Sequence, residues 1–322
     1  MKRGLVIGKF LPLHKGHISL INFAKERCDE LIVFAHKGDD DCIDITVRLG
    51  WLYKVFGDDK SIKIEANDIL LPESSVPSKD VSRVWADYLI KRFPDVKVLF
   101  SSEKYGEYVS GYMEIENVVY DIDRNILPIS ATEIRKNPYK NWSFLPEVVK
   151  PYYFKKTCIY GPESTGKTTL TKKLADWYNT DFVPEMAVVY LGDRHVVYDD
   201  FEKIYVLQAE EVLKKSKTTE KILFCDTDLF TSKIYSEHYF GKYPKIPKWV
   251  EATHNYDHYL FCDIDVPWVP HVQRDSQNFR EIHRRLFMKE LTDRKIDFTL
   301  ISGDWDTRFQ TAVEALKSKF GI

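Results

Sequence analysis

Two glycine-containing turns, each between an apolar run and a segment of helical periodicity, constrain the fold of this chain most strongly. The first, GKFLPLHKGH (residues 8–17), follows the apolar run 5–7, and the second, GPESTGKTT (161–169), follows the run 157–160. A strand that leads through such a turn into a helix starts a βαβ unit, and βαβ units build parallel sheets. The sequence therefore predicts two α/β domains.

Apolar runs and helical segments alternate along both halves of the chain. In the first half the patterns predict strands at 4–8, 29–36, 62–68 and 96–103 and helices at 17–28, 47–57 and 80–93. In the second half they predict strands at 157–161, 181–185, 222–228, 258–264 and 298–302 and helices at 166–179, 201–216, 279–294 and 307–320. We expect two doubly wound parallel sheets with helices on both faces.

A proline-containing stretch divides these halves. Residues 138–155 hold Pro138, Pro146 and Pro151 and show little periodicity, so we predict a linker between a domain of residues 1–137 and a domain of residues 156–322. A length of 322 residues suits two domains.

Composition excludes several classes of partner. A net charge of -2 gives no overall attraction to nucleic acid or membrane, and no run of 18 apolar residues is present. The five cysteines are scattered and odd in number, which favours free thiols in a reducing compartment. We expect a cytoplasmic protein with small-molecule ligands; the sequence leaves open whether it is a homo-oligomer.

The second turn fits the pattern G-x-x-x-x-G-K-[ST]. Glycines let the backbone close around an anion, and successive N–H groups and the helix N-terminus supply positive charge. Lys167 is expected to reach the β- and γ-phosphates of ATP, and the Thr168 hydroxyl to bind Mg²⁺. The other candidate ATP-binding residues of this turn are Gly161, Glu163, Ser164, Thr165, Gly166 and Thr169.

Charged residues beyond this turn complete a candidate phosphotransfer site. Asp226 ends an apolar strand, so we assign it as the carboxylate that binds Mg²⁺ together with Thr168, and Asp228 is the next candidate. For one of these two aspartates, capping of the next helix is the alternative. Glu185 is a candidate for the base that accepts a proton from a substrate hydroxyl. The alternative is that Glu185 is an ordinary carboxylate in a solvated loop. Arg274 and Arg280 are candidate lid arginines that bind ATP, although a charged helix start also explains Arg280.

The first turn carries His14 and His17 at the start of a predicted helix. Two histidines without a third ligand make a metal site improbable, whereas imidazole N–H donors beside a helix N-terminus suit a triphosphate. The candidate ATP-binding residues of this turn are Gly8, Lys9, Phe10, His14 and His17.

This turn resembles the H-x-G-H signature of the nucleotidyltransferase superfamily. A second signature of that superfamily, I-S-x-T-x-x-R, matches ISATEIR at residues 129–135. The resemblance implies that His14 and His17 bind ATP phosphates, that Ser130, Thr132 and Arg135 close over them, and that a nucleotidyl group is transferred in line.

A transferase of this kind followed by a P-loop kinase resembles the NadR-type bifunctional proteins, with further similarities in VRLGWL, CDTD and SGDWDTRFQTAVEAL. The resemblance implies phosphorylation of nicotinamide riboside, followed by adenylylation of nicotinamide mononucleotide to NAD. The candidate substrate-binding residues are Arg48, Trp51, Trp85, Glu185 and Asp228. For each tryptophan, a place in an ordinary helix core is the alternative.

Two departures from the family pattern leave alternatives open. Enteric members carry an N-terminal helix-turn-helix, but here the first strand is expected at about residue 4, so DNA binding is not expected. In the kinase half, Met186 and Val188 replace a tyrosine and an arginine, so the second domain could be a nucleotide sensor or a kinase of altered specificity. Coenzyme A synthase is a further alternative, and fused sulfurylase–kinase enzymes are a more distant one.

Overall fold

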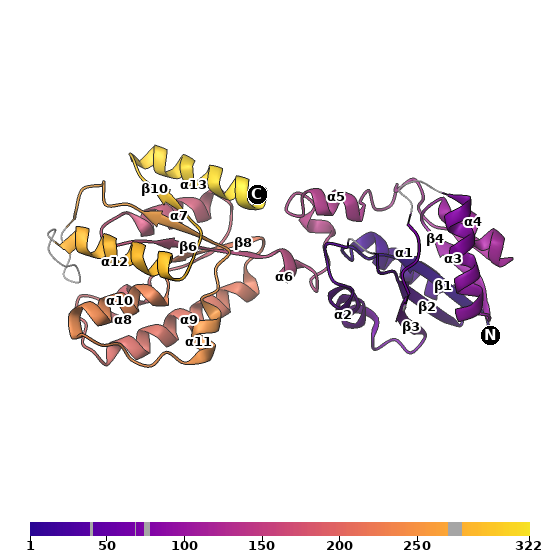
Figure 1. The fold of residues 1–322 in the computed structure, drawn as a ribbon, viewed down its shortest axis with the longest axis horizontal. Helices are drawn as coiled ribbons and strands as arrows, with labels where there is room; N and C mark the ends of the chain where they lie inside the picture. The colour runs from indigo at the N-terminus through magenta and orange to yellow at the C-terminus, as the bar shows by residue number, and fades with distance from the viewer. Residues whose placement is uncertain (39–40, 68, 74–77, 270–278) are drawn as a thin grey trace. The chain divides into compact units, whose positions relative to one another are not determined.

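The computed structural model describes residues 1–38, 41–67, 69–73, 78–269 and 279–322, which form two compact units, Met1–Tyr153 and Phe154–Ile322 (Figure 1). Most of the predicted linker lies in the first unit. Leu145 and Val149 are completely buried there, and the Tyr139 hydroxyl donates to the Tyr153 carbonyl at 2.9 Å. The prolines of this segment interrupt regular structure but do not prevent it from packing.

The first unit contains a parallel five-stranded sheet in the order β3-β2-β1-β4-β5. Its strands are β1 (Arg3–Gly8), β2 (Glu30–Ala35), β3 (Ile62–Ala66), β4 (Val96–Ser101) and β5 (Glu116–Val119). The order reverses between β1 and β4, which is where open α/β sheets bind ligands beyond the carboxyl ends of their strands. The turn with the two histidines follows β1 and therefore lies at this position.

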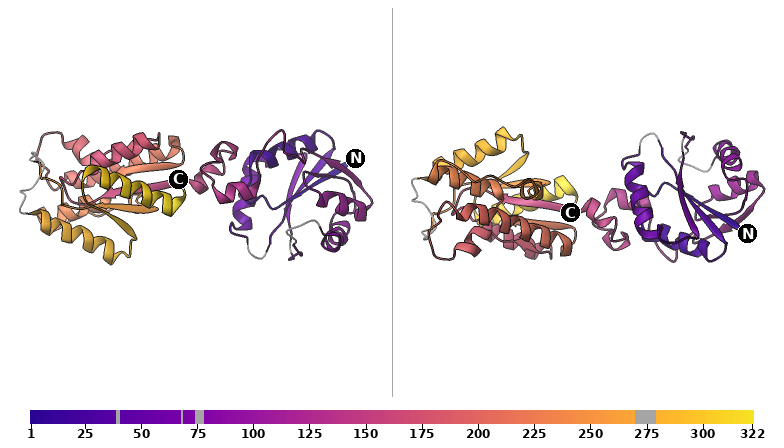
Figure 2. Two further views of the ribbon diagram at one scale, coloured as in Figure 1. Left: turned by 90° about the horizontal axis from the view of Figure 1, so that it is seen from above. Right: turned by 90° about the horizontal axis from the view of Figure 1, so that it is seen from below.

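Helices cover both faces of this sheet (Figures 1 and 2). The helices of this unit are α1 (Lys15–Lys25), α2 (Ile45–Phe56), α3 (Lys79–Arg92), α4 (Tyr105–Met113), α5 (Ala131–Lys136) and α6 (Lys150–Tyr153), with the 3₁₀ turn η1 (Trp142–Phe144). Leu89 of α3 and Val109 of α4 pack with Leu5 and Phe34 in one buried cluster. This packing fixes the end of β1.

The second unit contains another parallel five-stranded sheet, in the order β10-β9-β6-β8-β7. Its strands are β6 (Lys155–Tyr160), β7 (Phe182–Val183), β8 (Ile222–Asp226), β9 (His258–Cys262) and β10 (Phe298–Ile301). The central strand β6 leads into the glycine-rich turn, and β8 beside it ends at Asp226. The two doubly wound sheets confirm the predicted fold class.

The helices of the second unit also lie on both faces of its sheet. They are α7 (Lys167–Trp177), α8 (Met186–Leu191), α9 (Asp200–Thr218), α10 (Leu229–Phe240), α11 (Lys248–Thr253), α12 (Arg280–Asp293) and α13 (Trp305–Phe320). Leu174 of α7 and Leu316 of α13 share a core cluster with Ile159, whereas Phe287 of α12 packs on the other face with Tyr160. Among the described residues, no helix has the length and apolar character needed to cross a membrane.

Two candidate nucleotide-binding sites

The histidine turn places both imidazoles together at the start of α1. His14 is the N-cap residue, and its Nδ1 accepts a hydrogen bond from the His17 backbone N–H at 3.3 Å. The two rings stack with centroids 3.7 Å apart. A Cβ on Gly16 would lie 2.9 Å from Cε1 of His14, so a glycine is needed beside the stacked pair. The turn therefore presents two adjacent nitrogen donors at a helix N-terminus.

Both imidazoles are neutral near pH 7. Burial, and then the charge of Arg124, lowers the pKa of His14 to about 3. Burial, His14 and Arg124 together hold the pKa of His17 well below its usual value. Since Nδ1 of His14 accepts a hydrogen bond, its proton lies on Nε2 and can be donated. Nδ1 of His17 is buried without a hydrogen-bond partner among the described residues, as expected if a ligand completes the site.

The second transferase motif is held against this turn. Ser130 caps α5 by accepting from the Glu133 N–H at 3.1 Å. Arg135, on the same short helix, donates from Nη1 to the Leu11 carbonyl at 2.5 Å and from Nη2 to Thr132 Oγ1 at 3.1 Å. The two sequence motifs thus meet in space through Arg135.

Arg48 supports the turn from inside the protein. It is completely buried and donates to the carbonyls of Lys9 and His36, at 2.6 and 2.8 Å, and to Asp41 at 2.7 Å. This position suits a structural clamp, although Nε of Arg48 has no hydrogen-bond partner among the described residues. Lys9 itself is partly exposed and pairs with Asp41 and Glu73, so its ammonium group lies at the surface of this cluster.

The remaining candidates of the first unit differ in exposure. Phe10 is buried, and its ring meets His17 edge-on with centroids 5.0 Å apart. Trp51 is 5% exposed and packs on Tyr152, which is a core position. Trp85 is only partly buried, donates from Nε1 to the Pro72 carbonyl at 2.9 Å and contacts the ring of His36. Of the two tryptophans, only Trp85 retains a surface that a ligand can reach.

In the second unit, the glycine-rich turn has the backbone of a phosphate-binding loop. Gly161 and Gly166 adopt φ values of +136° and +81°, which favour glycine. A Cβ on Gly161 would lie 2.6 Å from the Cys262 carbonyl oxygen. Lys167 begins α7, and its Nζ donates to the Pro162 carbonyl at 2.8 Å. The lysine thus folds back over the turn, at the place where an anion would lie.

Thr168 and Asp226 meet beside this turn, as the sequence predicts. The Thr168 hydroxyl donates to Asp226 Oδ2 at 2.5 Å, while Oδ1 of Asp226 is buried without a hydrogen-bond partner in the described part of the chain. Burial, and then the charge of Glu185, raises the pKa of Asp226 to about 6, although Lys167 opposes this. The raised pKa shows that the nearby lysines do not offset the burial of this carboxylate, and its Oδ1 has no hydrogen-bond donor among the described residues. This donor set therefore fits a divalent metal ion.

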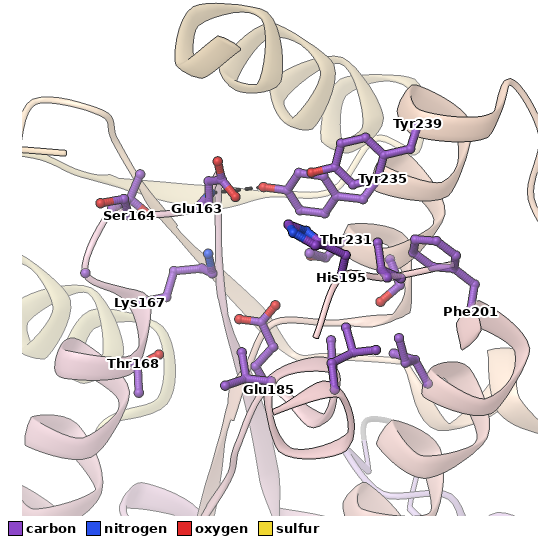
Figure 3. Close-up of a pocket in the computed structure, with 18 of the residues that line it drawn as sticks. Glu163, Ser164, Lys167, Thr168, Glu185, His195, Phe201, Thr231, Tyr235 and Tyr239 are labelled. Atoms are coloured by element: carbon purple, nitrogen blue, oxygen red, sulfur yellow. Dashed lines mark hydrogen bonds between the residues drawn. The ribbon is translucent and has the colours of Figure 1, made fainter. Parts of the chain in front are cut away.

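A cavity of about 570 Å³ runs from this turn to a wall of aromatic side chains (Figure 3). Residues 163–169 of the turn, among them Glu163, Lys167 and Thr168, line one end. Glu185, half-buried at the N-terminus of α8, points its carboxylate toward Lys167. The rest of the lining includes His195, Val196, Phe201, Ile204, Thr231, Tyr235, Tyr239 and Phe240, of which Phe201 lies far from the turn and Tyr235 beside it (Figure 3). The cavity can therefore hold a phosphate donor and an apolar or aromatic acceptor in line.

None of the site residues predicted from the sequence belongs to this aromatic wall. Its residues lie on α9, on α10 and in the segment before α9, all distant in sequence from the phosphate turn. Tyr235 is directly connected to that turn, because its hydroxyl accepts a hydrogen bond from the Glu163 backbone N–H at 3.1 Å. The only local signal is the density of aromatic residues around 230–240.

Other predicted residues of this unit occupy different positions. Asp228 is buried, caps α10 through the Thr231 N–H at 3.1 Å, accepts from the Tyr259 hydroxyl at 3.0 Å and does not line the cavity. It therefore has the capping role that is the alternative for one of the two aspartates. Arg280 donates to the Ser164 carbonyl at 3.4 Å and so reaches the turn. Arg274 lies outside the described residues.

Comparisons with known proteins identify relatives of the whole chain. A family model described as an AAA domain matches residues 156–308. The chain is 30% identical, over 99% of its length and 83% of theirs, to the trifunctional NAD biosynthesis/regulator proteins NadR of Salmonella typhimurium and Escherichia coli. It is also 26% identical to the nicotinamide-nucleotide adenylyltransferase of Pyrococcus furiosus, over 42% of this chain and 72% of that protein.

Solved structures agree on the fold. A NadR protein in complex with NAD and AMP-PNP superposes with a TM-score of 0.69 at 23% identity, over 100% of this chain and 96% of that one. A NadR protein in complex with NR gives a TM-score of 0.68 at 22% identity, over 100% and 97%.

Proposed function

The chain belongs to the NadR family, and from this premise we propose that it makes NAD in two ATP-dependent steps. The second unit phosphorylates nicotinamide riboside to nicotinamide mononucleotide, and the first unit adenylylates the mononucleotide to NAD with release of pyrophosphate. One observation carries the proposal: each unit holds a complete phosphate-binding turn, and each turn lies at the carboxyl edge of its own sheet.

For the first unit, we propose that His14 and His17 donate to ATP phosphates. Because both imidazoles are neutral, they bind through hydrogen bonds rather than ion pairing, and they stabilise the charge that develops near the α-phosphorus. Ser130, Thr132 and Arg135 close the same site from α5. An oxygen of the mononucleotide phosphate attacks the α-phosphorus, a new P–O bond forms, and the bond to the β-phosphate breaks. The acceptor is already anionic, so the step needs positioning and no general base.

For the second unit, the turn and Lys167 hold the β- and γ-phosphates of ATP. Glu185 lies between Lys167 and the aromatic wall, where it can accept the proton of the primary hydroxyl of the riboside. The hydroxyl oxygen attacks the γ-phosphorus, and ADP leaves with the electrons of the broken bond. Phe201, which lies away from Lys167, lines the part of the cavity that would receive the nicotinamide ring (Figure 3).

Thr168 and Asp226 would hold Mg²⁺ with the nucleotide. When bound, the ion neutralises charge on the β- and γ-phosphates. No group of three His, Cys, Asp or Glu side chains suited to a metal occurs among the described residues, so we expect most of the ligands of Mg²⁺ to come from phosphate and water.

A sensor role is the second candidate for this unit because of one residue in the wall of the cavity, Val188. Val188, which replaces the arginine typical of the family, lines the cavity, whereas the backbone of Met186 is held by Gln208 Oε1 at 2.9 Å. The cavity wall therefore lacks a cation at position 188. A sensor would bind ATP at this turn without phosphorylating the riboside.

Two reciprocal variants test the division of labour. His17→Ala is expected to lose NAD formation from the mononucleotide and to keep riboside phosphorylation, and Lys167→Ala is expected to do the reverse. In each variant, the activity that is retained shows that the unchanged unit is folded. Both activities are followed by chromatography of the products. Loss of both activities in a folded single variant would contradict two independent sites.

A further inference from the structure

The cavity of the second unit can hold the phosphates of ATP and the acceptor, but none of its lining residues is assigned to the base of ATP. Its lining comes from the phosphate turn and from residues that follow β7 and β8 in the chain. In-line transfer places the acceptor beyond the γ-phosphate, so the rest of the donor extends away from it. In the order β10-β9-β6-β8-β7, that direction leads from the turn after β6 toward β9 and β10.

On that side, an exposed aromatic ring touches the phosphate turn. Trp305 begins α13, directly after the loop that follows β10. A Cβ built on Gly166 would lie 2.5 Å from Cζ3 of Trp305, so the indole packs directly on the turn. Half of the Trp305 surface is nevertheless exposed. A large ring that contacts a phosphate loop and keeps a free surface is suited to stacking on a nucleobase.

The loop that carries Trp305 is rigidly attached to the phosphate turn. Arg308, 2% exposed, donates to the Thr165 carbonyl at 3.0 Å and to the Gly303 carbonyl at 2.9 Å, and it forms an ion pair with Asp265. Asp265 in turn accepts from the Gly303 N–H at 2.5 Å. These bonds fix the start of α13 relative to the turn, so the indole is preorganised rather than mobile.

We propose that Trp305 is the stacking surface for the purine base of the phosphoryl donor in the second unit. The proposal rests on the proposed kinase function and adds to it a residue that holds the base of the donor. Stacking contacts the face of a base and makes no hydrogen bonds to its edge. Trp305 therefore contributes to the binding of ATP and of GTP alike, and contributes nothing to a triphosphate without a base.

The test compares two ligands on the full chain. All variants carry His17→Ala, which is expected to weaken nucleotide binding at the first unit, and Lys167→Ala identifies the signal that depends on the phosphate turn. Calorimetric titration measures binding of the non-hydrolysable analogue AMP-PNP and of inorganic tripolyphosphate, each with Mg²⁺. Trp305→Ala and Trp305→Phe are compared with Trp177→Ala, another exposed tryptophan of the same unit, which packs on Phe309.

Trp305→Ala is expected to weaken AMP-PNP on the order of 10-fold and to leave tripolyphosphate unchanged. Trp305→Phe, which keeps an aromatic face, and Trp177→Ala are expected to stay within about threefold of the parent. Unchanged AMP-PNP binding in a folded Trp305→Ala variant would overturn the proposal. So would equal weakening of both ligands, which would mean that Trp305 only shapes the turn. Absence of any Lys167-dependent binding in the parent would overturn the kinase function itself, and Trp305 with it.

Discussion

Asp226→Asn is predicted to stabilise the ligand-free second unit while it removes kinase activity. In the folded chain, burial raises the pKa of this carboxyl from 3.8 to about 6. Since each factor of ten in proton affinity corresponds to about 1.4 kcal/mol, keeping Asp226 ionised at pH 7.5 costs about 3 kcal/mol. Asparagine keeps an oxygen that can accept from Thr168 and removes the charge, so we expect most of this cost to be recovered.

The pH dependence gives the sign of the effect. Between about pH 4 and pH 6 the folded state binds more protons at Asp226 than the unfolded state, so this group destabilises the fold increasingly as the pH rises through that window. The advantage of Asp226→Asn is therefore full at pH 7.5 and small at pH 4.5. For a unit of this size, 2 to 3 kcal/mol corresponds to roughly 4–12 °C in Tm.

Scanning calorimetry of the full chain at both pH values measures this difference. Asp306→Asn is the matched control in the same unit, because the Asp306 side chain is 94% exposed and pairs only at the surface with Lys173. A Tm for Asp226→Asn at or below that of the parent at pH 7.5 would refute the reasoning, as would an equal gain at both pH values. Mg²⁺ with AMP-PNP should raise the Tm of the second unit more in the parent than in the variant, because the variant has lost a ligand of the metal ion.

Four further changes test other parts of the two sites. Arg48→Met leaves Asp41 without its buried partner and is expected to destabilise the first unit by about 3–5 kcal/mol in urea unfolding. Arg135→Met, which loses the bonds to Leu11 and Thr132, should raise the KM for ATP in NAD formation but not in riboside phosphorylation. With the pKa of His14 at about 3, kcat/KM of the transferase should not fall between pH 8 and 6 through protonation of this residue; an inflection near 6.5 that disappears in His14→Asn would contradict this. Glu185→Gln should lower kcat of the kinase roughly 10²- to 10⁴-fold with little change in the KM for ATP, and a kcat near that of the parent would exclude Glu185 as the base.

Local signals in the sequence were sufficient for the phosphate turns. Lys167 and Thr168 lie within one short motif whose spacing fixes their positions, and Asp226 ends an apolar run that reads clearly as a strand. The structure accordingly brings Thr168 and Asp226 into contact. The alternation of apolar and amphipathic segments was likewise sufficient for the class of fold, because parallel sheets impose that alternation.

Features that depend on long-range packing could not be predicted in this way. The sequence shows Arg48 as a charged residue beside an aromatic one, but only the folded chain brings the carbonyls of Lys9 and His36 to its guanidinium group. The helix α10 was not predicted because apolar and aromatic residues surround it on most sides, and its Tyr235 meets the phosphate turn only in three dimensions. Short β5 and α5 carry too few residues for a periodic signal.

Product analysis of the purified chain tests the two-site pathway most directly. The protein is given ATP and Mg²⁺ with either nicotinamide mononucleotide or nicotinamide riboside, and the products are separated by chromatography. NAD is expected from both substrates, with the mononucleotide as an intermediate from the riboside. NAD from the mononucleotide alone would contradict the kinase step and point to Met186 and Val188, and no NAD from either would contradict the pathway as a whole.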